Sequence, residues 1–233
     1  MRYIFGILIF TSGFYAIGLE SPKAYRPPDK AWKSTFAVGK GDWIPTGRNA
    51  FFILEPGYQL VLEGDGVRLV INVTDQIRIV DGVETRMVEE RETESGSLVE
   101  VSRNYFAMDK NTNDVYYFGE DVDIYKAGKI IGHEGSWLSG EKGAKFGLMM
   151  PGQASAGLRY CQEVAPGLAV DRAANVNSIE TVITPAGEFK NCLKVEETTP
   201  LEPDSKEYKY YAPGIGLVRD GDLLLNKHGF IGK

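Results

Sequence analysis

The sequence has few of the residues on which hydrolases and zinc sites depend. Among its 233 residues are two cysteines, Cys161 and Cys192, and two histidines, His133 and His228. Nucleophilic hydrolysis needs a serine or cysteine, an oriented base and an oxyanion hole, and no Gly-x-Ser-x-Gly motif is present. No zinc or EF-hand spacing occurs either. One enzyme alternative is left, a hydrolase in which His133 acts beside Glu134 or Glu163.

The chain also lacks clusters of basic residues and, after its first 19 residues, any long apolar run. Its formal net charge is −6. Affinity for phosphate comes mainly from Lys and Arg, so we expect no nucleic-acid partner. No segment after residue 19 is apolar for the roughly 18 residues that a membrane helix needs, so we expect no membrane span in the mature chain.

The first residues have the three parts of a secretory signal. Arg2 is followed by an uncharged, apolar run, and Ala16-Ile17-Gly18 offers a small-x-small cleavage site. We therefore expect a signal peptide over 1–18 and export to the periplasm or the medium, with an uncleaved anchor as the alternative. Residues 19–50 are expected to form an extended leader whose Trp32, Phe36 and Trp43 pack against the body.

From residue 51 onward the pattern is that of one all-β domain, 51–233. Apolar and polar residues alternate with period two, and short turn sequences such as Gly64-Asp65-Gly66, Asp81-Gly82 and Ser95-Gly96 separate the runs. No 10-residue helical period interrupts them. We predict a single large curved antiparallel sheet, a half-barrel or barrel-like meander, with a long Gly-rich loop over 135–157.

The two cysteines fall on predicted strands. Alternation places both Cys161 and Cys192 on the more polar face, where a free thiol is uncommon. In an exported protein a disulfide is the natural explanation. Sequence alone does not show whether the two Cα atoms come close enough, so a disulfide and two unpaired thiols both stay open.

Two segments resemble a known group of proteins. Thr184-Pro185-Ala186-Gly187-Glu188-Phe189 and the run from Tyr211 to Val218 resemble uncharacterised bacterial exported proteins, among them the DUF3108-type envelope proteins with curved antiparallel sheets. The resemblance implies an envelope or periplasmic setting and a half-barrel related in shape to lipoprotein carriers. It implies no catalytic residue.

Aromatic residues suggest a binding function. A curved sheet with aromatic and aliphatic side chains on its inner face can form an apolar groove for a lipid or acyl chain, and the Gly-rich loop could cover it. The predicted ligand-binding residues are Tyr117, Trp137, Phe146, Met149, Tyr160 and Tyr210. The same residues could equally belong to an ordinary core.

A second group is rich in carboxylates. Glu120, Asp121 and Asp123 precede His133, and a hairpin between them would bring the four together. Such a group could hold a hard divalent cation such as Ca²⁺, although acidic residues at strand ends are usually solvated. The sequence thus favours an exported, non-catalytic protein of the cell envelope that binds an apolar or lipid-like ligand and needs no cofactor. The alternatives are a carboxylate-rich metal-binding module and the His/Glu hydrolase.

Overall fold

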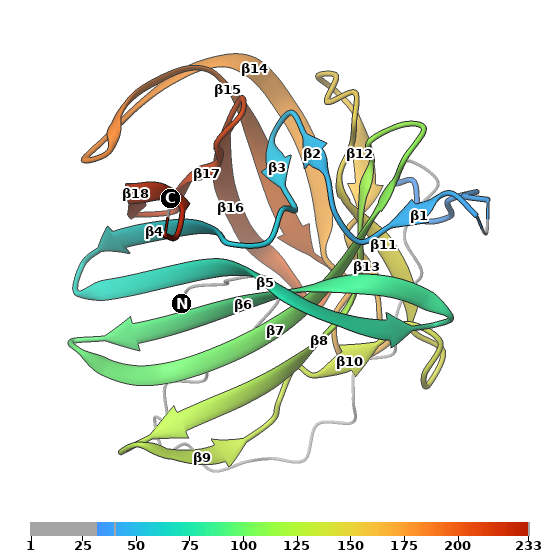
Figure 1. Ribbon diagram of the computed structural model, residues 1–233, viewed down its shortest axis with the longest axis horizontal. Helices are drawn as coiled ribbons and strands as arrows, with labels where there is room; N and C mark the ends of the chain where they lie inside the picture. Colours follow the sequence, from blue (N-terminus) through green and yellow to red (C-terminus); the bar gives the residue numbers. More distant parts are fainter. Residues whose placement is uncertain (1–31, 40, 233) are drawn as a thin grey trace.

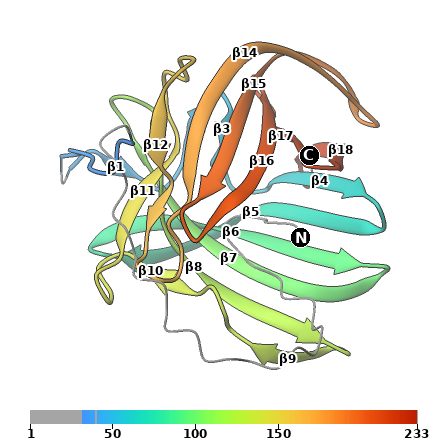
Figure 2. The ribbon, with the colours of Figure 1, turned by 180° about the vertical axis from the view of Figure 1, so that it is seen from behind.

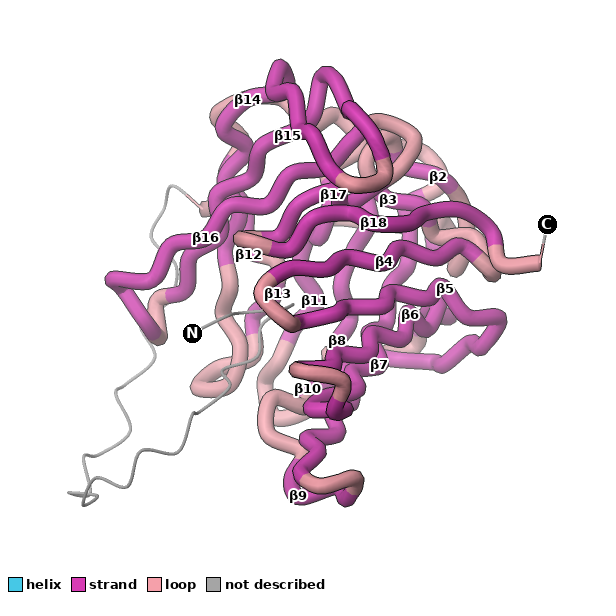
Figure 3. The backbone as a smooth tube through the Cα atoms, turned by 90° about the vertical axis from the view of Figure 1, so that its left-hand side faces the viewer, coloured by secondary structure: helices cyan, strands magenta, loops and turns pink. Residues whose placement is uncertain are grey.

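The computed structural model describes residues 32–39 and 41–232, and this part of the chain contains strands and no helix (Figure 3). The predicted signal peptide lies outside the described residues. None of the described residues belongs to a helix that could cross a membrane. The strands are β1 (Trp43–Ile44), β2 (Arg48–Asn49), β3 (Phe52–Ile53), β4 (Tyr58–Gly64), β5 (Val67–Val80), β6 (Val83–Glu94), β7 (Ser97–Asp109), β8 (Val115–Lys126), β9 (Lys129–Gly132), β10 (Trp137–Leu138), β11 (Lys145–Met150), β12 (Arg159–Cys161), β13 (Glu163–Val164), β14 (Arg172–Thr184), β15 (Gly187–Thr199), β16 (Glu202–Ala212), β17 (Gly216–Asp220) and β18 (Leu223–Phe230).

Sixteen of these strands form one antiparallel sheet that curls nearly into a barrel (Figures 1 and 2). The order is β12-β14-β15-β16-β17-β18-β4-β5-β6-β7-β8-β11-β13, with β1 added at β7 and β9 and β10 added at β8. Only Gln162 separates the two end strands, β12 and β13, in the chain. They do not pair with each other, so the barrel has one unsealed seam. The predicted curved antiparallel sheet is confirmed.

Tight turns set the register of the long hairpins. At four of them both central residues have positive φ, as in type I′ turns, whose twist matches that of the paired strands. These are Asp65-Gly66, Asp81-Gly82, Ser95-Gly96 and Ala127-Gly128. Because each turn fixes the pairing of its two strands, it also fixes which side chains face the interior.

The β2–β3 hairpin is not part of the large sheet. It forms a separate two-stranded sheet and crosses one mouth of the barrel (Figure 1). On one side Asn49 Nδ2 donates to Asn113 O at 2.8 Å and to Pro151 O at 3.0 Å. On the other side Ala50 O accepts from Gly214 N at 2.7 Å. The hairpin thus spans the opening between the β7–β8 end and the β16–β17 turn.

The segment before this hairpin covers part of the outer surface of the barrel. Phe36 and Trp43 pack edge-on against Tyr116, and Trp43 also contacts Phe118 and Phe146 at 5.2 and 5.5 Å between ring centroids. Trp32 is buried under two arginines. These aromatic residues pack as the sequence predicted, but regular structure begins before residue 51, at β1 and β2. The segment 135–157, expected as a loop, also contains β10 and β11, both hydrogen-bonded to β8.

Candidate functional site

The inner face of the barrel has an apolar part and an acidic part. On β4 and β5 the inward positions are aliphatic, with Leu62 opposite Leu69 and Leu60 opposite Ile71. The ladder then pairs Ile71 with Glu90 on β6. From there around the barrel, acidic side chains replace aliphatic ones at inward positions.

Six carboxyl groups are buried in this acidic part. We call them the interior carboxyl cluster, and each is at most 4% exposed: Glu90, Glu92, Glu100, Glu120, Glu163 and Asp220. They come from β6, β7, β8, β13 and β17, so strands far apart in the sequence contribute to one cluster. One lysine lies among them: Lys209 on β16 is 2.8 Å from Glu197 and 3.9 Å from Asp220.

Several of these carboxyl groups lack a hydrogen-bond donor among the described residues. Both side-chain oxygens of Glu90 and both of Glu120 are buried without one, as is one oxygen each of Glu100 and Glu163. Buried polar groups in proteins are nearly always hydrogen-bonded, so each exception calls for an explanation. Leaving such a group unsatisfied costs about 1–3 kcal/mol. A cluster of this kind is retained at a cost to stability.

Burial raises the pKa of several of these acids. Removal from water raises the pKa of Glu90, Glu120 and Glu163 well above the ordinary range, and neighbouring carboxyl groups raise it further, whereas Lys209 opposes the shift at Glu90. The same two causes, burial and then Glu92, raise the pKa of Glu100 to about 8. Burial lowers the pKa of Lys209, but Asp220 and Glu197 outweigh this effect, so the pKa of Lys209 is also raised. The interior therefore combines several carboxyl groups of raised pKa with one paired ammonium.

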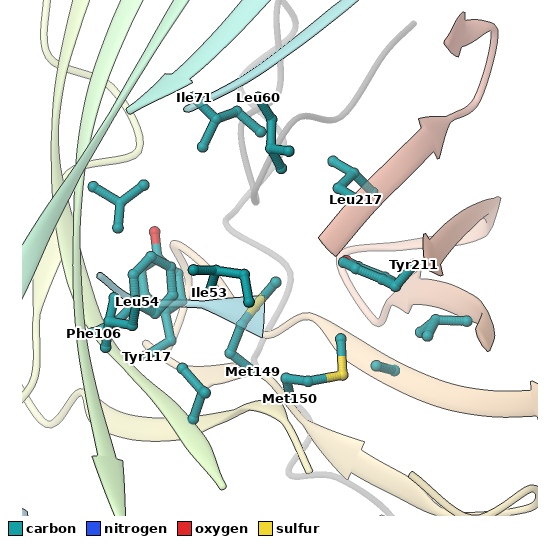
Figure 4. Close-up of a cluster of buried hydrophobic side chains, with 14 of the residues drawn as sticks. Ile53, Leu54, Leu60, Ile71, Phe106, Tyr117, Met149, Met150, Tyr211 and Leu217 are labelled. Atoms are coloured by element: carbon teal, nitrogen blue, oxygen red, sulfur yellow. The ribbon is translucent and has the colours of Figure 1, made fainter. Parts of the chain in front are cut away.

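A cavity lies beneath the β2–β3 hairpin. Its volume is about 30 Å³, and Phe51, Phe52 and Ile53 form the wall on the hairpin side. Figure 4 shows Ile53 between a group of Leu54, Phe106 and Tyr117 on one side and Tyr211 and Leu217 on the other. The remaining walls are mostly aliphatic or aromatic, and Glu90 is the one charged residue that lines it. The cavity therefore combines an apolar surface with one carboxyl group that has no hydrogen-bond donor in the described part of the chain.

The predicted ligand-binding residues are spread over different places. Tyr117, Met149 and Tyr160 are buried in the core, and Tyr117 donates to Asn104 Oδ1 at 2.6 Å. Phe146 belongs to the outer aromatic group under the N-terminal segment. Tyr210 lies near Lys194 and Arg219 and is only half-buried. The structure does not bring these six residues into one site.

Trp137, the sixth of them, forms part of a second hollow. This open cleft of about 290 Å³ lies between the β10–β11 region and the turn at 165–168. Trp137 pairs with Glu120 across the β8–β10 ladder, and its buried Nε1 has no acceptor among the described residues. The floor of the cleft is thus one strand from the interior carboxyl cluster.

The four predicted metal ligands lie on two faces of β8. Glu120 points into the barrel, whereas Asp121 and Asp123 point outward, where Asp121 pairs with Arg78 and Asp123 with Arg103. His133 Nδ1 is 2.9 Å from Asp123 Oδ1. Among the described residues no three His, Cys, Asp or Glu side chains are arranged to hold a metal ion. Strand alternation, which the predicted hairpin did not take into account, separates Glu120 from the others.

The fold also decides whether the residues of the predicted His/Glu hydrolase, and those of the predicted disulfide, lie close together. The His133 side chain is 66% exposed on the outer surface, whereas Glu163 is buried inside the barrel. Cys161 and Cys192 are both buried, and no disulfide joins them. They face β14 at Arg172 and Glu180, and eight strand residues span roughly 26 Å. A disulfide needs Cα atoms within about 7 Å.

Comparison of the chain with protein-family models, with curated proteins and with solved structures finds no match. The resemblance to DUF3108-type envelope proteins therefore stays a prediction. The function has to be argued from the geometry of the barrel alone.

The sequence reasoning missed the residues of the interior carboxyl cluster other than Glu120 and Glu163. Glu90 and Glu92 stand in a long, polar segment, and acidic residues normally lie outside. One signal was available, because Glu90 and Glu92 alternate with Arg91 and Thr93, and continue the face of Val88. The period-two alternation alone therefore places both acids on the same strand face as the apolar Val88.

Proposed function

We propose that this protein is an exported, non-catalytic binding protein that encloses a small, largely apolar ligand in the barrel, beneath the β2–β3 hairpin. The observation that carries the proposal is the cavity itself. It lies between two walls of the sheet, its lining is apolar apart from Glu90 and a few other polar groups, and a structural element outside the main sheet covers part of it. Ligand sites are typically apolar hollows with a few placed polar groups.

The size of the cavity limits the ligand and requires the hairpin to move. About 30 Å³ accommodates roughly two water molecules, so a long acyl chain does not fit the closed arrangement. The hairpin contributes one wall and joins the barrel through few hydrogen bonds, notably those of Asn49 and Ala50. Its outward displacement would enlarge the cavity without breaking the sheet.

Binding of n-alkanols from ethanol to 1-octanol tests this proposal. Each added methylene is expected to tighten binding about fourfold, because its burial contributes about 0.8 kcal/mol, until the enlarged cavity is full. Isothermal titration calorimetry gives the affinities. Val88 lines the cavity, so Val88→Leu adds one methylene there and should weaken 1-hexanol binding at least tenfold.

Val176→Leu is the matched control, because Val176 is 42% exposed on β14. This substitution should leave 1-hexanol binding unchanged. Equal binding to both variants, or no binding of any alkanol up to its solubility limit, would overturn the proposed function.

Export rests on residues 1–18, which lie outside the described part of the chain. Mass spectrometry of the protein secreted by its host tests it. A mature mass that begins at residue 19 is expected, and an intact N-terminus would contradict cleavage.

A further inference from the structure

We infer that the ligand of the barrel cavity carries an ammonium group, which Glu90 binds as a carboxylate. This inference rests on the proposed function and adds the chemical class of the ligand. The cavity walls are apolar, and the one charged residue in their described lining is an acid whose carboxyl oxygens have no hydrogen-bond donor among the described residues.

Glu90 is placed to receive a donor from the cavity. It is 2% exposed, it lines the cavity, and neither of its side-chain oxygens has a hydrogen-bond donor among the described residues. Ile71 and Ser102 are its cross-strand neighbours on β5 and β7. An ammonium group has three donors and no acceptor. It therefore matches two open carboxyl oxygens better than a hydroxyl group, which offers a single donor.

The charges around Glu90 favour a cation. The titratable and charged groups that act on it are Glu92 from its own strand, Glu100 from β7, Glu120 from β8, Lys209 from β16 and Asp220 from β17. Four of these five are acids, and Lys209 already lies against Glu197 and Asp220. Each of these acids that ionises would repel an anionic ligand. A cation would compensate the charge that Glu90 acquires on ionisation.

The aromatic lining adds to this preference. Phe51 and Phe52 from the hairpin side, with Tyr58 and Tyr211 from the barrel, contribute rings to the cavity walls. The faces of aromatic rings attract cations, by about 0.5–2 kcal/mol each when water is excluded. The cavity thus offers a carboxylate for the ammonium and an apolar surface for the rest of the molecule.

Binding of the cation has a stoichiometric consequence. Burial raises the pKa of Glu90 well above its ordinary value, although Lys209 opposes the shift. The ammonium pairs with the ionised form, so a Glu90 that is protonated in the free protein gives its proton to solvent on binding: one O–H bond breaks, one ion pair forms, and up to one proton is released per ligand. Affinity should therefore rise about tenfold per pH unit while that release lasts.

The experiment compares n-hexylammonium chloride with 1-hexanol and sodium hexanoate, which have the same chain. Calorimetry at pH 7 in two buffers of different ionisation enthalpy gives both the affinity and the number of protons released. We expect hexylammonium to bind at least tenfold more tightly than hexanol and to release about one proton, and hexanoate not to bind. In Glu90→Gln the preference and the proton release should disappear, while hexanol binding is kept. Glu94→Gln, at an exposed position of the same strand, should behave as the wild type.

Each other outcome has a defined reading. Equal affinity for hexanol and hexylammonium, or tight binding without proton release, overturns the ammonium inference and leaves the proposed function standing. If no hexyl compound binds, the proposed function itself fails. Hexylammonium binding that survives Glu90→Gln but is lost in Trp137→Phe places the ligand in the open cleft and overturns the inference. If Glu90→Gln does not fold, the wild-type comparison of the three compounds across pH still decides.

Discussion

Lys209 Nζ lies 2.8 Å from Glu197 Oε2 inside the barrel, and the lysine side chain is only 2% exposed. The two residues come from neighbouring strands, β16 and β15, and Lys209 also faces Asp220 on β17. Its ammonium is therefore the compensating charge for the acidic side of the interior. Buried lysines are rare unless they are paired, and here the pairing joins three consecutive strands of the sheet.

Replacing this lysine should leave the acids around it without a compensating positive charge. Lys209→Met keeps much of the side-chain volume but leaves Glu197 and Asp220 without their cation. We expect the free energy of unfolding to fall by about 3–5 kcal/mol, as when one partner of a buried ion pair is removed. Urea denaturation at pH 7 measures it. Lys206→Met is the control, because the pair of Lys206 with Glu196 is 51% and 24% exposed and should be worth less than about 1 kcal/mol. Similar losses in both variants would contradict a special role of the buried pair.

The interior acids should make the protein less stable as the pH rises. Folding raises the pKa of Glu100 from its ordinary value of 4.5 to about 8, so the folded state keeps a proton that the unfolded chain has lost. The contribution is complete below pH 4.5 and is lost as the pH rises toward 8, by up to about 1.4 kcal/mol per pH unit. Urea denaturation at pH 5, 6, 7 and 8 gives the slope.

Glu100→Gln assigns that slope to one residue. Glutamine does not titrate, so the slope of the unfolding free energy between pH 5 and 8 should decrease by the contribution of about one proton. The variant should be at least as stable as the wild type at pH 8. Glu94→Gln should leave the slope unchanged. A stability that increases with pH over this range would show that the interior acids are ionised and paired in the folded protein.

Asn49 should control how firmly the hairpin closes the cavity. Its amide donates to Asn113 O and Pro151 O, and its Oδ1 accepts from Phe51 N at 2.8 Å. Asn49→Ala removes all three bonds at a buried position, which should cost about 1–3 kcal/mol. We expect the substitution to accelerate hydrogen exchange more in 47–54 than in β5. It should also accelerate the association of 1-hexanol in stopped-flow measurements. Arg48→Ala, which removes an exposed ion pair with Glu55, should change neither rate appreciably.

Much of the fold could be predicted because the deciding signals are local. Asp65-Gly66 and Asp81-Gly82 are residue pairs that favour type I′ turns, and alternation then gives long antiparallel strands. The inward face of β6 and β7 was harder to predict. Glu90 and Ser102 are cross-strand partners inside the barrel, but acidic and hydroxyl residues normally lie outside. Their burial follows from closure of the sheet, which depends on strands more than 100 residues away.

The candidate site could be predicted less well for the same reason. Glu120 and Asp121 are adjacent in the sequence yet lie on opposite faces of β8, so a cluster in sequence did not become a cluster in space. Trp137 and Phe146 were expected on one covering loop. They lie instead on separate short strands, β10 and β11, with Trp137 over the interior and Phe146 on the outer surface.

The two cysteines, which no disulfide joins, give a simple check of the strand order. Cys161 and Cys192 are buried at 1% and 0% exposure, so native protein should react with Ellman's reagent very slowly, and unfolded protein should release about two equivalents. The melting temperature should not change with dithiothreitol. A reducible bond between the two cysteines, found by mass spectrometry of peptides, would contradict the positions of β12 and β15 on either side of β14.

Gly119 tests how β10, and with it Trp137, is held at the sheet. Its φ is +127°, and a Cβ there would lie 2.3 Å from Trp137 O and 2.8 Å from Leu138 Cα. Gly119→Ala must therefore push β10 away from β8, in addition to straining the backbone, and the loss of stability should exceed about 3 kcal/mol.

Gly128→Ala separates backbone strain from the collision. Gly128 also has positive φ, +73°, but a Cβ there meets nothing within 4 Å, so its cost should be the backbone term alone, about 1–2 kcal/mol. Urea denaturation compares the two variants, and near-ultraviolet circular dichroism reports the packing of Trp137 against Tyr117, now 5.4 Å between ring centroids. If Gly119→Ala is no less stable than Gly128→Ala and keeps the wild-type spectrum, β10 does not lie against Gly119, and the cleft beside Trp137 has a different floor.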